Sequence, residues 1–283
     1  MPIIGIIASQ NYPRSVSFNA DVLVIAGGAG GGKDNTASGG GGGAGGFLFS
    51  PTQSLTTGTN YSVTLGAGGN GSTTTGVAGS NGSNSQFHSI TASVGGGGGG
   101  SWNGSISVTS SGGSGGGAAG ALTNQTGGAA TSGQGNAGGN VTSGAPYSGA
   151  GGGGAGAVGQ NAGNTADGAA GGAGSANSIT GSSVDYAGGG GGGRGSGSNG
   201  AGGAGGGGAG GGTNGTVNTG GGGGGANNAT SVAGNGGSGV IIIKYADTRT
   251  ITFGAGVTGT ESSPSGGFKR ATITAGTGNV SWA

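Results

Sequence analysis

DVLVIAGGAGGG (residues 21–32) and GGSGVIIIKY (residues 236–245) both join a run of β-branched and apolar residues directly to glycine. β-branched residues favour strands, whereas glycine weakens regular elements. The unbroken apolar run at 240–243 is typical of a strand that is buried on both faces. Such a strand needs a partner, and we expect it to pair with the strands near the start of the chain. The glycine-rich sequence between them is then an insertion.

Glycine dominates the composition, with 90 of 283 residues. Glycine loses more conformational freedom on folding than any other residue, so a glycine-rich chain tends to resist order. Collagen is excluded, because it needs glycine at every third position and abundant proline, whereas this chain has continuous glycine runs and five prolines. Seven basic and six acidic residues nearly cancel, which fits poorly with charge-driven disorder. Two hypotheses remain: a flexible linker, or a structure that only backbone without side chains can build.

Strand signals lie at both ends of the chain. Runs rich in β-branched and aromatic residues occur at 21–26, 46–49, 61–65, 86–94, 239–245, 249–253, 268–275 and 279–282. The last two runs are separated by Gly276, Thr277 and Gly278, which predict a short hairpin loop. No segment shows the apolar spacing of an amphipathic helix over three turns. We therefore expect an all-β protein with essentially no α-helix.

The insertion at about residues 95–238 is long for a structureless loop, because loops beyond about 15 residues are uncommon in compact domains. Extended glycine can form polyglycine-II helices, which share the geometry of polyproline II, with three residues per turn and no internal hydrogen bonds. Neighbouring helices can pair their backbone groups if nothing larger than a methyl group separates them. Alanine and serine are the commonest interruptions of the glycine runs, which favours such a bundle. Loops are expected at 101–111, 121–148, 160–167, 175–186, 213–219 and 226–232.

The predicted fold is a small β-sandwich with a long inserted bundle of polyglycine-II helices. The chain divides into three expected parts: an N-terminal attachment arm or strand (1–20), a glycine-rich domain (21–245) and a C-terminal β segment with a hairpin (246–283). Within the glycine-rich domain, the sandwich strands are expected at 21–94 and 239–245.

One stretch resembles a phosphate-binding loop. Residues 27–33 follow a predicted strand and match the pattern G-x-x-x-x-G-K. However, Asp34 stands where that loop needs serine or threonine to hold Mg²⁺, and no helix signal follows. Chance matches are expected in a chain that is one-third glycine, so we predict no nucleotide site.

Catalysis and metal binding are not expected either. The sequence has no cysteine, one histidine and six scattered carboxylates, so it offers neither a thiol nor an acid–base pair. His88 falls in the predicted strand at 86–94, where a half-exposed polar residue is the ordinary interpretation. We predict a protein that is not an enzyme and needs no cofactor. The net charge of +1, without a basic stripe, also predicts no nucleic-acid partner, and no membrane insertion is expected.

Three aromatic residues, Trp102, Tyr147 and Tyr186, lie beside glycine runs and away from the predicted sandwich. An exposed aromatic ring offers a flat apolar face with a polar tip, which suits contact with a sugar or a protein at low entropic cost. The alternative is that each ring seals one end of the bundle from water. Both interpretations stay open, and the three residues are candidate receptor contacts.

Five segments together resemble a known family: VLVIAGGAGGG (22–32), GGGGGAGGF (39–47), YSVTLGAGGNG (61–71), NTGGGGGG (218–225) and GGSGVIIIKY (236–245). They are similar to the glycine-rich domain of tail-fibre and virion proteins of tailed phages, and to the glycine-rich ectodomain of the anaplastic lymphoma kinase family. The resemblance covers about residues 21–245 and concerns architecture rather than chemistry. It implies a jelly-roll-like sandwich with polyglycine-II helices between its strands and receptor-binding loops at their distal ends.

The flanking segments, 1–10 and 248–283, look like segments of virion structural proteins. The resemblance therefore implies a protein of the virion, expected to be a tail-fibre tip or adhesin for host attachment. It would contact other virion proteins or copies of itself through the N-terminal arm and the C-terminal strands. Its expected host partner is a surface glycan or an outer-membrane protein. The alternative is a purely structural subunit that self-assembles into fibres or decorates the capsid without binding a receptor.

Overall fold

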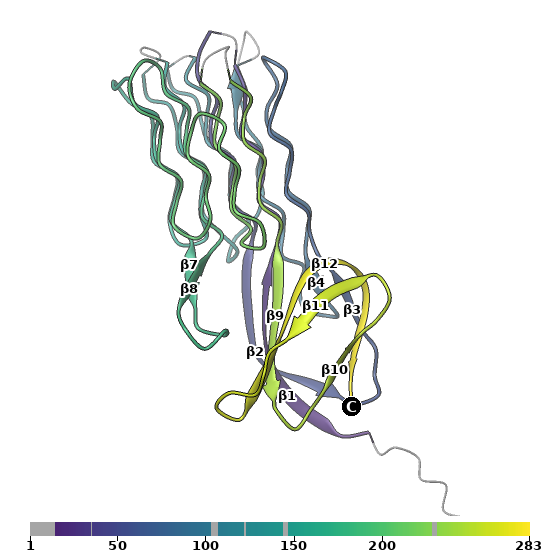
Figure 1. Cartoon of the computed structure of the whole chain (residues 1–283). Helices are drawn as coiled ribbons and strands as arrows, with labels where there is room; N and C mark the ends of the chain where they lie inside the picture. Colours follow the sequence, from purple (N-terminus) through teal and green to yellow (C-terminus); the bar gives the residue numbers. More distant parts are fainter. Residues whose placement is uncertain (1–14, 35, 103–106, 122, 144–146, 228–230) are drawn as a thin grey trace, which may run out of the picture.

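The computed structural model describes residues 15–34, 36–102, 107–121, 123–143, 147–227 and 231–283. Within these ranges every regular element is a β-strand and there is no helix, so the all-β prediction is confirmed. It follows that no helix that could cross a membrane is found in the described chain. Figure 1 shows two parts, a curled sheet and a set of long glycine-rich segments that extends away from it. Of the expected N-terminal arm or strand at 1–20, residues 1–14 lie outside the described residues, and residues 17–20 form the start of β1.

The strands are β1 (Ser17–Ile25), β2 (Phe47–Thr56), β3 (Tyr61–Thr64), β4 (Gln86–Phe87), β5 (Ser101–Trp102), β6 (Ser107–Val108), β7 (Ser175–Asn177), β8 (Val184–Tyr186), β9 (Val240–Ala246), β10 (Ile251–Phe253), β11 (Val257–Glu261) and β12 (Phe268–Trp282). Strands β1 to β4 and β9 to β12 form one sheet, which we call the β-body. We call the described residues within 26–46, 66–85, 94–174 and 187–239 the glycine-rich bundle. Strands β5 and β6 form one short hairpin, and β7 and β8 form another.

Strand β1 lies between β2 and β9 and pairs antiparallel with both. Ile25 at the end of β1 lies opposite Val240 at the start of β9. The expected pairing of the late apolar strand with an early strand is therefore confirmed. The chain leaves the sheet after Ile25 and returns at Val240, so the two ends of the glycine-rich sequence lie side by side.

The curl of the sheet comes from β12, which has two sets of partners. Its first part pairs with β9 and β11, and its second part pairs with β3 and β10. The change occurs near Gly276, whose φ of 104° is rarely adopted by other residues. A Cβ added there would lie closer than 3.0 Å to the Gly256 oxygen. The hairpin expected at 276–278 is thus wrong, because glycine here bends one continuous strand instead of ending it.

The strand expected at 86–94 is much shorter in the structure. β4 has two residues, and the following His88 has a φ of 49°, which turns the chain. The Ile90 N–H donates to the Phe87 carbonyl at 3.1 Å and closes the turn. The β-branched residues of this run favour a strand, and the local turn geometry overrides that preference.

The two faces of the β1–β9 pair belong to different hydrophobic clusters, because side chains alternate along a strand. One face joins the main core of the β-body, which contains Ala20, Val22, Val24, Leu55, Tyr61, Val63, Phe87, Ile241, Ile243, Tyr245, Ile251, Ala271, Ile273, Val280 and Trp282. The opposite face, with Leu23 and Ile242, packs against Ile179 and Tyr186 of the β7–β8 hairpin. The prediction that 240–243 is buried on both faces is confirmed, and a hairpin from within the insertion covers the second face.

The C-terminal strands are part of the β-body. β12 pairs with β9, and Ile273, Val280 and Trp282 belong to the main core together with residues of β1. Residues 246–283 therefore complete the sheet that carries the insertion.

Hydrogen bonds in the glycine-rich bundle recur with a period of three residues. In the segment at 26–33, every third N–H group donates to the same neighbour: one set to 77–83, the next to 234–237 and the third to 40–46. The donor–acceptor distances in this segment are 2.9 to 3.4 Å. Buried backbone groups must be paired, and here other glycine-rich segments provide the partners. The described part of the insertion is therefore ordered chain rather than a linker.

The segments of the bundle lie too close together for side chains. A Cβ added to Gly31, Gly41 or Gly116 would fall closer than 3.0 Å to a backbone oxygen of a neighbouring segment. Where more room exists, small residues fill it, and these form a buried cluster of Ala118, Val141, Ala150, Ala162 and Ala169. The composition of the runs thus follows from the packing distance.

Candidate functional site

The end of the glycine-rich bundle farthest from the β-body, which we call the distal end, is the first candidate site (Figure 1). The segments at 26–33 and 39–46 pair antiparallel with one another, so the chain reverses between them, in a distal turn that contains Asp34 and Ser38. Ser38 in this turn contacts two other segments: its N–H donates to the Tyr147 carbonyl, and its hydroxyl donates to the Arg194 carbonyl. Turns that are far apart in the sequence therefore meet at the distal end.

Charged side chains gather at the distal end. Between β1 and β9 the chain has five charged side chains: Lys33, Asp34, Asp167, Asp185 and Arg194. Arg194 follows Gly193, whose N–H donates to the carbonyl of Gly39 beside the distal turn. Asp167 accepts a hydrogen bond from the N–H of Ser198, in the turn after Arg194. Four of the five charges therefore lie at this end, and Asp185 lies in the β7–β8 hairpin.

Asp34 is buried and organises this end. One carboxylate oxygen accepts the N–H groups of Thr36 at 3.0 Å and Ala37 at 3.2 Å, and the other accepts the N–H of Trp102 at 2.7 Å. A buried carboxylate is costly unless hydrogen bonds compensate it, and three backbone donors do so here. Asp34 thus clamps the distal turn and fixes the position of Trp102.

Two of the three candidate aromatic residues lie at the distal end. Trp102 is half-buried at the end of β5, and Tyr147 is 47 % exposed. Tyr147 has a φ of 67°, a conformation that tyrosine adopts only when its surroundings impose it, and such strain is often found at functional sites. The structure brings these two residues to one end, and their role as receptor contacts stays a prediction.

Tyr186 is not a surface residue, so its selection as a receptor contact is wrong. It lies in β8, is 6 % exposed, and packs in the cluster with Leu23, Ile25 and Ile242. Burial raises the pKa of its hydroxyl. The physical reason is that the second apolar face of the β1–β9 pair needs a cover, and the Tyr186 ring forms part of it.

The stretch that resembles a phosphate-binding loop is part of the bundle. The N–H groups of residues 27–33 all donate to carbonyls of neighbouring segments, whereas phosphate binding needs N–H groups that are free to point at the ligand. The Lys33 ammonium group donates to the Thr73 carbonyl at 3.2 Å. These backbone donors are therefore committed to the fold.

Metal-binding clusters are absent from the described ranges, where no three His, Cys, Asp or Glu side chains come together. His88 lies exposed in the turn after β4, with its ring edge-on to Tyr61 and 5.1 Å between the ring centres. This contact gives the histidine a packing role beside the main core.

A group of coupled ionisable side chains lies in the β-body. The Tyr245 hydroxyl donates to Glu261 Oε1 at 2.6 Å, and Lys269 Nζ lies 3.3 Å from Glu261 Oε2. Burial alone would raise the pKa of Glu261, but hydrogen bonds from Tyr245, the Ile251 N–H and Lys269 outweigh it and hold this pKa below its ordinary value. The carboxylate thus ties β9, β10, β11 and β12 together.

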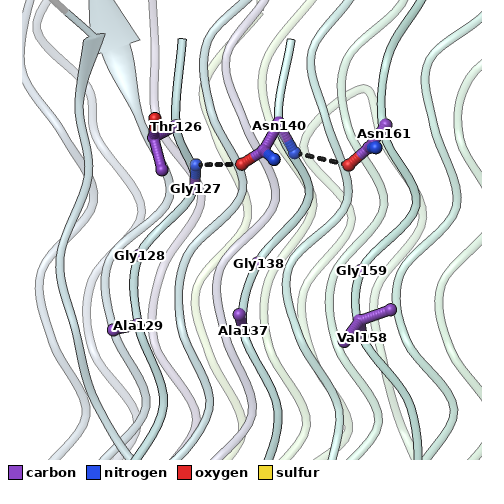
Figure 2. Close-up of a pocket in the computed structure, with 10 residues that line it drawn as sticks. All are labelled: Thr126, Gly127, Gly128, Ala129, Ala137, Gly138, Asn140, Val158, Gly159 and Asn161. Atoms are coloured by element: carbon purple, nitrogen blue, oxygen red, sulfur yellow. Dashed lines mark hydrogen bonds between the residues drawn. The ribbon is translucent and has the colours of Figure 1, made fainter. Parts of the chain in front are cut away.

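A second candidate site is an open groove of about 420 Å³ on the flank of the bundle, which we call the flank groove (Figure 2). Three neighbouring segments form it, at 126–129, 137–140 and 158–161. Asparagine side chains link them: the Gly127 N–H donates to Asn140 Oδ1 at 2.9 Å, and the Asn140 N–H donates to Asn161 Oδ1 at 2.8 Å.

A smaller groove of about 200 Å³ adjoins the flank groove and shares Thr126 and Asn140 with it. The residues that line the two grooves are glycine, alanine, valine, threonine, asparagine and glutamine, and none of them is charged. Together they form a continuous neutral surface.

The sequence predicts one loop at 121–148 and gives no indication of the flank groove. In the structure, bundle segments run through this range. The sequence does contain a signal for these segments. Polar residues stand three positions apart in each of them, at Asn140 and Ser143 and at Asn161 and Asn164, and the two pairs lie side by side. Ser143 Oγ lies 2.8 Å from Asn164 Oδ1, as this alignment requires.

The comparisons identify this chain at the level of a domain family. A comparison with curated proteins finds no match. The family described as "Glycine-rich domain" matches residues 8–246, which include β1, β9 and the whole glycine-rich bundle. The chain belongs to this glycine-rich domain family.

Proposed function

We propose that the glycine-rich bundle is a lattice of polyglycine-II helices carried by a small jelly-roll-like β-sandwich. The period of three in the hydrogen bonds supports this, because a helix with three residues per turn presents every third N–H to the same neighbour. The lack of space for a Cβ on the buried glycines supports it as well. With a rise of about 3.1 Å per residue, the path from Ile25 to Asp34 would place the distal end roughly 28 Å from the sheet.

We propose further that the protein belongs to the virion of a tailed phage, where it acts as an adhesin at the tip of a tail fibre. The assignment to a tailed phage rests on the resemblance of residues 21–245, and the observation that carries the adhesin role is the convergence of Trp102, exposed Tyr147 and four charged side chains at the distal end. Aromatic residues and arginine contribute most of the binding energy at many interfaces. A rigid bundle would present them with little loss of entropy on binding.

The β-body would face the particle. The N-terminal arm and the C-terminal strands would contact other virion proteins or copies of this chain. The host partner at the distal end would be a surface glycan or an outer-membrane protein.

Adsorption of phage particles to host cells tests the adhesin role. Changing Trp102 and Tyr147 to alanine together should weaken adsorption by about tenfold or more, because loss of interface aromatics commonly costs more than about 1.4 kcal/mol. Phe49→Ala is the matched control, because Phe49 is similarly exposed, at 43 %, but lies on β2 of the β-body. Normal adsorption of the double variant, in particles that assemble normally, would refute the role of the distal end.

A purely structural subunit is the second candidate. It is favoured by β2, which lies at an edge of the sheet and carries exposed Phe49, since an edge strand can pair with another copy. This function predicts that the purified protein forms regular polymers visible by electron microscopy and has no affinity for host cells.

A further inference from the structure

We propose that the flank groove binds a neutral oligosaccharide. The inference rests on the proposed attachment role and gives the molecule a second contact region, on the flank of the bundle and separate from the aromatic residues of the distal end.

The flank groove offers hydrogen-bonding groups that are neutral and unused. Asn140 and Asn161 use their Oδ1 atoms within the bundle, which leaves each Nδ2 group without a partner in the described part of the chain. The Ala137 N–H and the Gly127 carbonyl likewise have no partner among the described residues. Thr126 adds an exposed hydroxyl that can donate and accept. Donors and acceptors of this kind match the hydroxyl groups of a sugar.

An apolar row accompanies the polar one. In Figure 2 the side chains of Ala129, Ala137 and Val158 lie at one level of the groove, and those of Thr126, Asn140 and Asn161 lie at another. Val158 is 61 % exposed. A sugar ring has a polar edge of hydroxyl groups and an apolar face of C–H groups. Two adjacent rows of opposite polarity suit both parts of the ring.

The flank groove is rigid because its floor is glycine in close packing. A Cβ added to Gly128, Gly138 or Gly159 would lie closer than 3.0 Å to a neighbouring backbone oxygen. A surface that is already ordered loses little entropy on binding, which favours a ligand that forms many weak hydrogen bonds.

Other classes of ligand fit the groove less well. A nucleic acid would need lysine or arginine, and none lines the groove. A protein partner would find none of the tryptophan, tyrosine or arginine residues that anchor interfaces. A glycine-rich segment of a second copy would find the N–H groups of Gly127 and Asn140 already donating to asparagine side chains, so of the groups named above only the Ala137 N–H and the Gly127 carbonyl could pair with its backbone.

Calorimetry with the full-length protein tests the proposal. The probes are neutral hexasaccharides of glucose, galactose, mannose and N-acetylglucosamine, with heparin as a charged comparison. We expect at least one neutral sugar to bind, and the double variant N140D/N161D to bind it about tenfold more weakly or worse, an effect of about 1.4 kcal/mol. Aspartate keeps the Oδ1 acceptor that the neighbouring segment uses and removes the Nδ2 donor.

A second asparagine ladder provides the matched control. The Gly71 N–H donates to Asn235 Oδ1, and the Asn235 N–H donates to Asn214 Oδ1, both at 2.8 Å. The double variant N214D/N235D makes the same chemical change outside the flank groove and should bind the sugar normally. V158E places a charge in the apolar row and leaves both ladder asparagines unchanged, so it should weaken sugar binding and provides a second test if N140D/N161D fails to fold.

Each result bears on the proposal. Binding of heparin alone, binding of no sugar, or equal losses in both ladder variants would overturn it. Self-association that N140D/N161D alone abolishes, measured by sedimentation, would assign the groove to a second copy and also overturn it. Attachment of the purified protein to host cells without binding of any panel sugar would keep the adhesin role and remove the groove. Sugar binding in the groove without attachment to cells would support the groove and refute the adhesin role.

Discussion

The β-body and the glycine-rich bundle are stabilised by opposite kinds of residue. The fully buried side chains of the β-body include Trp282, Tyr245 and Phe87, and burying a large apolar side chain contributes about 1.5–3 kcal/mol. In the bundle the buried material is backbone, and each hydrogen bond contributes only about 0.5–1.5 kcal/mol net. It follows that substitutions to smaller side chains should destabilise the β-body, whereas substitutions to larger side chains should destabilise the bundle.

The largest expected effect is loss of a core side chain in the β-body. Ile241 on β9 is fully buried, so Ile241→Ala should lower the free energy of unfolding by about 2–5 kcal/mol, measured by urea denaturation. Val217→Ala is the control, because Val217 is 67 % exposed, and it should change stability by less than about 0.5 kcal/mol. Similar effects of the two substitutions would mean that the β-body does not depend on side-chain packing.

The reverse substitution tests the bundle. A Cβ added to Gly41 would lie closer than 3.0 Å to the Gly190 oxygen, so Gly41→Ala should lower the free energy of unfolding by about 1–3 kcal/mol. At Gly163 the nearest atom to an added Cβ is Thr142 Oγ1 at 3.7 Å, so Gly163→Ala is the matched control and should be nearly neutral. A neutral Gly41→Ala would show that the segments are not in close contact.

A smaller effect concerns the pH dependence of stability that Glu261 gives to the β-body. The pKa of Glu261 is lowered in the folded protein, so the stability it contributes is present above the ordinary pKa of glutamate and is lost as the pH falls through the lowered value. Urea midpoints measured between pH 7 and about pH 3 should therefore fall less for Glu261→Gln than for the wild type. Salt should weaken the difference, because the carboxylate is partly exposed. An identical pH dependence of both proteins would contradict this role of Glu261.

The β-body was largely predictable, because its strands have strong local signals. The run at 240–243 can be stable only when covered on both faces, and both its strand character and its pairing were correct. The hairpin predicted at Gly276 is wrong because a glycine between two strand-like runs can either end a strand or bend it, and the local sequence does not distinguish the two. That choice depends on partners that are distant in the sequence.

The candidate sites were less predictable for a related reason. A tyrosine beside a glycine run, such as Tyr186, can equally well be exposed at the end of the bundle or buried against the sheet. Only the position of the β7–β8 hairpin decides between the two. Asn140 and Asn161 lie in sequence that is typical of loops. Each of their side-chain Oδ1 atoms accepts a backbone N–H of a neighbouring segment, in place of a backbone carbonyl. This role can be recognised only when the arrangement of the segments is known.

Amide hydrogen exchange, measured by NMR at single residues, tests most directly whether the glycine-rich sequence is ordered by backbone pairing. The N–H groups of Gly42, Gly190 and Gly223 donate to neighbouring segments at 2.8 to 2.9 Å, deep in the bundle. We expect them to exchange as slowly as the N–H groups of β1 and β9, because only opening of the bundle would release them. Fast exchange of all three, with continued protection of β1 and β9, would contradict the account and identify the insertion as a flexible linker.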